Sequence, residues 1–238
     1  MTYISGVDGC RSGWISVERD LATGELHSSC FRSAEELIRR LVPPRVLAID
    51  VPIGLTEHGK RTSDVEARIF LSWPRRCSVF SSPVRGLLRG FRDDMRREEA
   101  SDLHQQIDGR GIGVQAWGIV KKIKEVDDLM RQEASLQSWV REVHPEASFC
   151  AWAGRPMRFN KKTRQGREGR RQLVDSYFGS GSFASIRAAY RVKEVAHDDI
   201  LDAFAALWTA ERVLRNAYGT FPPEPALDSV GLKMEIVY

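Results

Sequence analysis

The residues of this sequence best suited to chemistry are aspartates that are far apart along the chain. Asp8 and Asp50 each follow a short apolar segment, while Asp199 and Asp202 stand three residues apart in a helical pattern and so share one helix face. Carboxylate oxygens are the ligands that hard cations such as Mg²⁺ and Mn²⁺ prefer. If the four acids converge, the chemistry they predict is metal-assisted hydrolysis of phosphodiester bonds.

Each acid also has a structural explanation. Aspartate often forms turns after strands, which fits Asp8 and Asp50, and Asp198 fits the N-cap of a helix. Asp199 would complement the helix dipole. Asp202 is the exception, because it interrupts an apolar helix face where a charge requires a partner or a metal. Crowded carboxylates raise one another's pKa, so a converged cluster would indicate a bound cation.

The strands that must position these acids follow from the pattern of apolar residues. A hairpin opens the chain, and a third antiparallel strand follows it. The next apolar runs lack alternation, which is typical of parallel strands buried on both faces. The predicted strands cover residues 3–7, 14–17, 25–31, 46–49 and 139–143. Ligands bind outside the carboxyl ends of such strands, so Asp8 and Asp50 should face one another if their strands are neighbours.

Helical patterns occupy most of the remaining chain. Ser33 and Glu36 form a capping box for a helix predicted to run through Leu41, where Pro43 and Pro44 follow. Further helices are predicted at about 64–71, 94–106, 116–130, 167–178 and 198–216, and a final edge strand at 232–238. Residues 56–137 are interpreted as a helical insertion within a single domain of residues 1–238. The predicted fold class is therefore α/β: a mixed sheet of three antiparallel strands followed by parallel strands, with flanking helices and a helical insertion.

Composition limits the class of protein and the partners it meets. A hydrophobic share of 42% and a charged share of 29% are those of a globular chain, not a disordered one. The net charge of +4 is too weak to indicate nucleic acid by itself. Basic residues gather in 75–97 and 155–171, which are either solvated faces or surfaces that contact phosphate. The start of the chain has no basic leader and no long apolar run, so we expect a cytoplasmic protein that does not meet the membrane.

Several segments, taken together, resemble a known pattern that spans nearly the whole chain. The matching pieces are residues 6–14, 48–54, 78–80 with Pro83, 115–117 with 122–127, 144–146, 161–163 with Gly166, and 198–203. The combination resembles the ribonuclease-H-like superfamily and, within it, domain-of-unknown-function family 429, a family of predicted nucleases. The resemblance implies that the mixed sheet is ribonuclease-H-like.

The resemblance also implies roles for individual acids. Asp8 looks like the first-strand aspartate of the superfamily, and Asp50 looks like its fourth-strand acid. Asp199 and Asp202 resemble an Asp-x-x-Asp-Ala motif on the last helix of Holliday-junction resolvases. Glu146 belongs to the pattern of the narrower family and has no counterpart in the superfamily's minimal site. The implied catalytic residues are all five acids, with the four aspartates as the metal ligands.

Four basic residues are candidates for contacting the phosphates of a substrate. They are Arg11, Arg76, Lys161 and Lys162. Ordinary solvation at the surface is the alternative explanation for each of them.

Three functions are compatible with these features. The first is a nuclease that uses Mg²⁺ or Mn²⁺ to hydrolyse phosphodiester bonds, with nucleic acid as its partner. The second is a non-catalytic module that binds nucleic acid or protein, in which the acids serve folding. The third is a metal-dependent hydrolase of a small phosphorylated molecule. The sequence leaves open the choice between DNA and RNA, the role of residues 56–137 and the oligomeric state.

Overall fold

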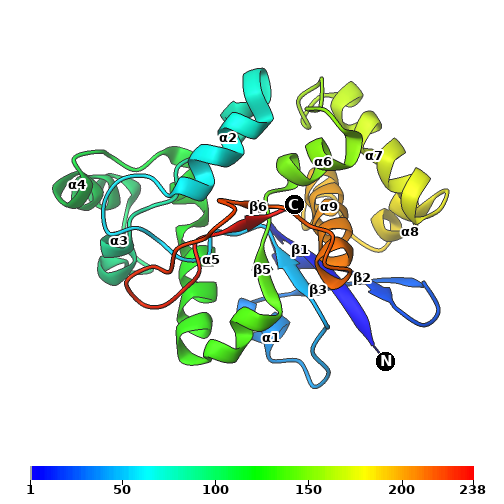
Figure 1. The fold of residues 1–238 in the computed structure, drawn as a ribbon, viewed down its shortest axis with the longest axis horizontal. Coiled ribbons are helices and arrows are strands. Elements are labelled where there is room, and N and C mark those ends of the chain that lie inside the picture. Colours follow the sequence, from blue (N-terminus) through cyan, green and yellow to red (C-terminus); the bar gives the residue numbers. More distant parts are fainter. Residues whose placement is uncertain (1) are drawn as a thin grey trace.

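The computed structural model describes residues 2–238, and a five-stranded mixed sheet lies at its centre (Figure 1). The strand order is β3-β2-β1-β4-β5. Neighbours among β1, β2 and β3 are antiparallel, whereas β4 is parallel to both β1 and β5. The strands are β1 (Tyr3–Cys10), β2 (Gly13–Asp20), β3 (Leu26–Phe31), β4 (Leu47–Ile49) and β5 (Val140–Glu142). The predicted α/β class and its order of antiparallel and then parallel strands are confirmed.

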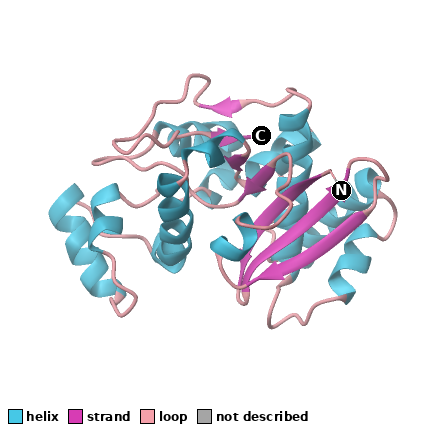
Figure 2. Cartoon of the chain, turned by 90° about the horizontal axis from the view of Figure 1, so that it is seen from below, coloured by secondary structure: helices cyan, strands magenta, loops and turns pink. Residues whose placement is uncertain are grey.

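Helices cover both faces of the sheet (Figure 2). On the central strand β1, alternate residues point to opposite faces. Ile4 packs among residues of α9 (His197–Leu214), whereas Val7 packs among residues of α1 (Ala34–Ile38) and α5 (Val114–Gln132). Asp8 has the same parity as Ile4, so it points to the face that α9 covers.

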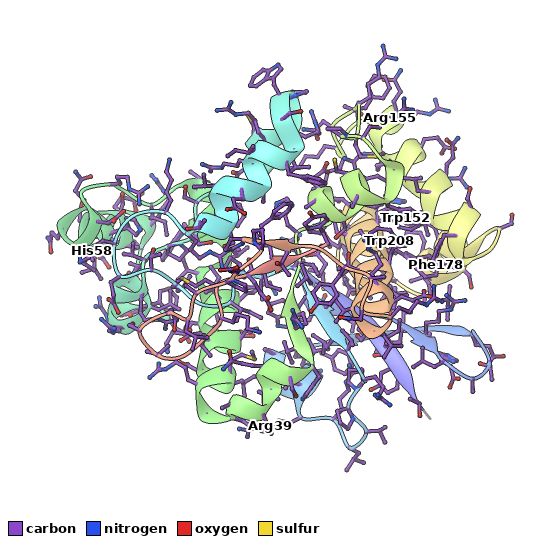
Figure 3. The ribbon with its side chains drawn as sticks, in the orientation of Figure 1. Arg39, His58, Trp152, Arg155, Phe178 and Trp208 are labelled. Carbon is purple, nitrogen blue, oxygen red and sulfur yellow. The ribbon has the colours of Figure 1, made fainter. Side chains whose placement is uncertain are left out.

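Three further helices pack around α9 on its face of the sheet. They are α6 (Pro145–Ala153), α7 (Arg164–Phe178) and α8 (Ser182–Ala188). Trp152 of α6 stacks on Trp208 of α9 with ring centroids 5.3 Å apart, and Phe178 of α7 meets Trp152 edge-on at 5.9 Å (Figure 3). These large aromatic contacts fix the position of α6 and α7 relative to α9.

Residues 56–137 are mainly helical and contribute no strand to the sheet. It contains α2 (Thr62–Arg75), α3 (Arg85–Gly90), α4 (Arg97–Asp108), α5, and the 3₁₀ turns η1 (Arg76–Ser78) and η2 (Ala134–Ser138). Buried ion pairs join this region to the rest of the fold. Arg61 donates to Glu142 of β5 and to Asp64, and Arg85 donates to Asp127 and Asp228.

Some predicted boundaries differ from the structure. Ser33 does cap α1, because its Oγ accepts from the amide of Glu36 at 3.2 Å, but the helix ends at Ile38 and not at Leu41. Leu41 is fully exposed, so a further helical turn would bury no apolar surface that could stabilise it. The predicted edge strand at 232–238 shrinks to β7 (Ile236–Val237), which pairs with β6 (Thr220–Phe221) in a separate small sheet. Helices α3, α6 and α8 were not predicted.

Across residues 2–238, the helices are too short or too polar for any one of them to span a bilayer.

Candidate metal centre

Asp8 and Asp50 lie side by side because their strands are parallel neighbours. Val7 is paired with Ile49, and the amide of Asp50 donates to the carbonyl of Val7 at 2.9 Å. Both carboxylates therefore leave the same end of the sheet on the same face. Asp202 of α9 joins them, and one carboxylate oxygen from each of the three aspartates lies within 4.8 Å of the others. Three of the four aspartates predicted as metal ligands thus come together.

Lys161 supplies the one ammonium group that forms an ion pair with a member of the acid cluster among residues 2–238. Its Nζ donates to Oδ2 of Asp202. Burial alone would lower the pKa of Lys161, but Asp202 and Asp8 raise it above the ordinary value. One positive charge therefore faces three carboxyl groups. Within the described chain, Oδ1 of Asp202 is buried and has no hydrogen-bond partner.

The three carboxyl groups are hard to ionise together. Burial and the neighbouring Asp50 and Asp202 raise the pKa of Asp8 well above its ordinary value. Burial and Asp202 raise the pKa of Asp50 to about 7, and burial raises the pKa of Asp202 to about 6, against the effect of Lys161. A divalent cation would remove this repulsion, because it would compensate the negative charge that Lys161 leaves unbalanced.

Glu146 lies beside this cluster but is held by a different partner. It stands in the first turn of α6, and its Oε1 accepts from Arg170, a completely buried arginine of α7. Arg170 also donates to the carbonyls of Phe159 and Gly166, and so it ties the loop that carries Lys161 to Glu146. The second oxygen, Oε2, is buried without a partner anywhere in residues 2–238. Glu146 is therefore positioned to face the cluster, not to belong to it.

Asp199 is placed differently from the other predicted ligands. It occupies the third position of α9, and its carboxylate accepts from the backbone amide of Ala196 at 2.8 Å. Burial raises its pKa, and its charge acts on Asp8 from a distance. The group of three acids with mutually close oxygens does not include it. In the structure, Asp199 closes the start of α9 while Asp202 points into the cluster.

Asp50 of the cluster opens into a cavity of about 560 Å³ between α2, α6 and the loop before α7, whereas Asp8 and Asp202 are not among the residues that line it. Figure 1 shows α2 standing opposite α6 and that loop. The cavity is lined by Asp50, Pro74, Arg75, Cys77, Ser78, Phe80, Gln115, Ile119, His144, Pro145, Glu146, Asn160, Lys161, Lys162 and Asp198. It therefore presents carboxylates and cations to the same enclosed volume.

The four predicted phosphate contacts are distributed unevenly around this cavity. Lys161 and Lys162 line it, and Arg76 lines an adjoining cavity of about 740 Å³. Arg11 is exposed on the turn between β1 and β2, and it is not among the residues that line either cavity. The structure thus leaves Lys161, Lys162 and Arg76 in reach of a ligand in these cavities.

Two further residues of the cavity were not predicted as site residues. Arg75 lines it, next in sequence to the predicted Arg76. His144 also lines it; its pKa is lowered by burial, and its Nε2 lies 3.4 Å from the carbonyl of Ser78. The sequence carries no signal that separates Arg75 from the other arginines of its basic stretch.

The donor set fits Mg²⁺ or Mn²⁺. It consists of carboxylate oxygens alone, with no cysteine or histidine in the group of three, and this suits hard cations. The unpartnered Oδ1 of Asp202 is free to accept a metal. Asp8, Asp50 and Asp202 are the residues that would hold the ion.

Comparison with known proteins gives one match. The family profile described as "Protein of unknown function (DUF429)" matches residues 6–227, which is most of the chain. Neither a curated protein nor a solved structure matches the sequence.

Proposed function

This chain belongs to the DUF429 family of proteins of unknown function, and we propose that it is a metal-dependent hydrolase of phosphodiester bonds. Nucleic acid is the substrate class that we propose. The observation that carries the proposal is the meeting of Asp8, Asp50 and Asp202 at the end of a mixed sheet, beside a cavity lined with cations.

Each side chain of the site has a separate role in this proposal. Asp8, Asp50 and Asp202 would hold Mg²⁺ or Mn²⁺. A bound ion of this kind would supply Lewis acidity and activate water. Lys161 and Lys162 line the same cavity as Asp50, so they can attract a phosphate and orient it toward the acids. Glu146 lines the cavity, and its buried Oε2 has no partner among residues 2–238, so this carboxylate can accept a proton or orient a water molecule.

We also propose that the fold is ribonuclease-H-like. Three antiparallel strands followed by parallel strands support this assignment, as does an aspartate at the end of the central strand β1. The closing helix α9 adds Asp202 to the same end of the sheet. The helical residues 56–137 would then shape the cleft above the end of the sheet at which the three aspartates meet.

A second candidate function is hydrolysis of a small phosphorylated molecule. One observation favours it: Asp50 opens into a cavity of about 560 Å³ under the helices of residues 56–137, a volume typical of small-ligand sites.

A manganese titration with a matched pair of variants tests the proposal. Asp8→Asn removes a ligand charge from the cluster, whereas Asp128→Asn removes one from the exposed ion pair with Lys124 on α5. We expect Asp8→Asn to weaken Mn²⁺ binding at least tenfold and to abolish cleavage of labelled oligonucleotides, and Asp128→Asn to change neither. Equal Mn²⁺ binding by Asp8→Asn and the unmodified protein would remove the basis of the proposal. Salt-dependent oligonucleotide binding without turnover at millimolar Mn²⁺ would instead indicate the non-catalytic module.

A further inference from the structure

Arg75 is a buried arginine that has no hydrogen-bond or ion-pair partner among residues 2–238. Its exposed fraction is 9%, and its side chain lines the same cavity as Asp50 and Lys161. Within residues 2–238 we find neither a hydrogen bond nor an ion pair made by this side chain, and its Nε is buried and unsatisfied. Burying an unpaired charge costs folding free energy, so its retention indicates a ligand that pairs with it.

Two other buried arginines show the contrast. Arg61 donates to Asp64 and Glu142, and Arg85 donates to Asp127 and Asp228. Each of these guanidinium groups therefore has its counter-charge within the fold. Arg75 differs from them in facing a cavity instead of a carboxylate.

The backbone brings Arg75 into this position through a break in α2. Ser72 has φ of 50° and ψ of −174°, and Trp73 is extended, so the regular helix stops before Pro74 and Arg75. Left-handed φ values are unfavourable for a residue with a side chain. The break turns the end of α2 toward the cavity, where Pro74 and Arg75 both line the wall.

The cavity continues away from the acids into a second one. The adjoining cavity of about 740 Å³ shares Cys77, Phe80 and Gln115 with the first. It adds three arginines from residues 56–137, namely Arg68, Arg76 and Arg110, of which Arg110 is paired with Asp108. A cationic path thus runs from the acid cluster past Arg75 and on under the inserted helices.

Aromatic side chains accompany this path. Phe80 lines both cavities, and Trp73, next to Pro74 at the wall, is 76% exposed. Sites that bind single-stranded nucleic acid combine a cationic groove with aromatic surfaces on which bases stack. A guanidinium fork matches two oxygens of one phosphate group.

We infer that Arg75 binds a backbone phosphate of single-stranded nucleic acid, whose chain extends from the acid cluster into the second cavity. This inference rests on the proposed function, because it takes the acids as the point where the chain is cut. It deepens that function by naming single strands as the substrate class and Arg75 as the residue that positions the strand.

Binding of a labelled oligothymidylate without metal tests the inference by fluorescence anisotropy. We expect Arg75→Gln to weaken binding at least tenfold and to reduce the slope of log affinity against log salt by about one. Arg75→Lys should recover part of the affinity, because it keeps the charge but loses the fork. Equal affinity of Arg75→Gln and the unmodified protein would overturn the inference.

Two further arms separate the sources of phosphate. Duplex DNA and thymidine monophosphate should both bind more weakly than the oligothymidylate. Arg76→Gln should weaken binding of the oligothymidylate but not binding of thymidine monophosphate. If thymidine monophosphate binds as tightly as the oligothymidylate, the single-strand assignment is wrong.

Unfolding and cleavage measurements complete the test. Because Arg75 has no partner to lose, Arg75→Gln should not lower the unfolding midpoint, whereas Arg85→Gln should lower it; a fall for Arg75→Gln equal to that for Arg85→Gln would contradict the inference. Asp8→Asn should keep metal-free oligothymidylate binding while losing Mn²⁺-dependent cleavage. Arg75-dependent binding without cleavage by the unmodified protein would therefore count against the proposed hydrolysis and not against the phosphate site.

Discussion

Gly6 of β1 and Leu207 of α9 are in direct backbone contact. A Cβ atom placed on Gly6 would lie 2.0 Å from the backbone nitrogen of Leu207 and 2.2 Å from the carbonyl oxygen of Ala203. The helix therefore rests on the central strand without a side chain between them. This close approach explains how Asp202, on the turn of α9 just before this contact, reaches Asp8 two residues further along the strand.

Gly6→Ala should therefore be strongly destabilising. The added methyl group meets backbone atoms that no rotamer change can move, so α9 must shift, and we expect a loss of about 3 kcal/mol or more in the free energy of unfolding. Gly118→Ala is the matched control, because Gly118 lies within α5 with no atom near its Cβ position, and alanine there should stabilise by about 1 kcal/mol. Urea unfolding followed by circular dichroism measures both. Similar stabilities for the two variants would show that α9 does not depend on this contact.

Asp50→Asn should change how stability depends on pH when metal is absent. The folded-state pKa of Asp50 is about 7, above the ordinary value near 3.8, so the folded protein keeps a proton that the unfolded chain has already released. The stability contributed by this proton is complete below about pH 4 and is lost as the pH rises through about 7. Asp50→Asn has no proton to release at this position, so its stability does not fall in this pH range. In EDTA it should be more stable than the unmodified protein above pH 7, by on the order of a few kcal/mol, and similar to it near pH 4.

Metal reverses this comparison. Mn²⁺ should stabilise the unmodified protein above pH 7, because the ion binds the ionised acids, and it should stabilise Asp50→Asn much less. Urea unfolding across the pH range, with EDTA and with Mn²⁺, gives all four curves. Parallel pH profiles for the two proteins in EDTA would mean that Asp50 ionises normally in the folded state.

Asp199 and Asp202 should respond differently to substitution by asparagine. Asp202→Asn removes a charge from the cluster and should weaken Mn²⁺ binding at least tenfold. Asp199→Asn keeps an acceptor for the amide of Ala196, so Mn²⁺ binding and stability should both stay near those of the unmodified protein. Asp199→Ala should lose about 1 kcal/mol of stability through the lost cap. Equal losses of Mn²⁺ affinity in Asp199→Asn and Asp202→Asn would make Asp199 a ligand after all.

Asp199 and Asp202 show what sequence patterns can and cannot predict about this site. Asp8 and Asp50 could be placed together because strand order and parallel pairing decide where carboxyl ends meet, whatever side chains follow. The spacing of Asp199 and Asp202 also predicted a shared helix face. However, α9 begins at His197 with Ala196 as its N-cap, so Asp198 is not the N-cap that was predicted. Asp199 falls at the third helical position, where its carboxylate accepts from the backbone amide of Ala196, and spacing alone cannot reveal this local competition.

Glu146 and Arg75 show two kinds of limit. Pro145 at the first helical position and Glu146 in the first turn are signals for the start of α6. The residues that follow, 147–150, are all buried and show no division into an apolar and a polar face, so no periodicity revealed the helix. No feature of the sequence marks Arg75 as a site residue. A sequence does not show that a surface-type residue will be buried without a partner, because that depends on the cavity formed by distant segments.

Lys161 should compete with metal for the acid cluster. Its ammonium group pairs with Asp202 and is held charged by Asp202 and Asp8, so a divalent cation that binds the same carboxylates must overcome this charge. Lys161→Gln removes the competitor. We expect Mn²⁺ binding at neutral pH to tighten about tenfold, which corresponds to about 1.4 kcal/mol. Calorimetric titration of Mn²⁺ measures the change.

Lys162→Gln provides the control for this prediction, because Lys162 lines the same cavity but is exposed, and no ion pair is found for it among residues 2–238. Its Mn²⁺ affinity should match that of the unmodified protein. Without metal, Lys161→Gln should be less stable than Lys162→Gln at neutral pH, since the three acids then repel one another with no cation between them, and this difference should shrink near pH 4 as they take up protons. If Lys161→Gln instead weakened Mn²⁺ binding, the lysine would be supporting the metal site and not occupying it.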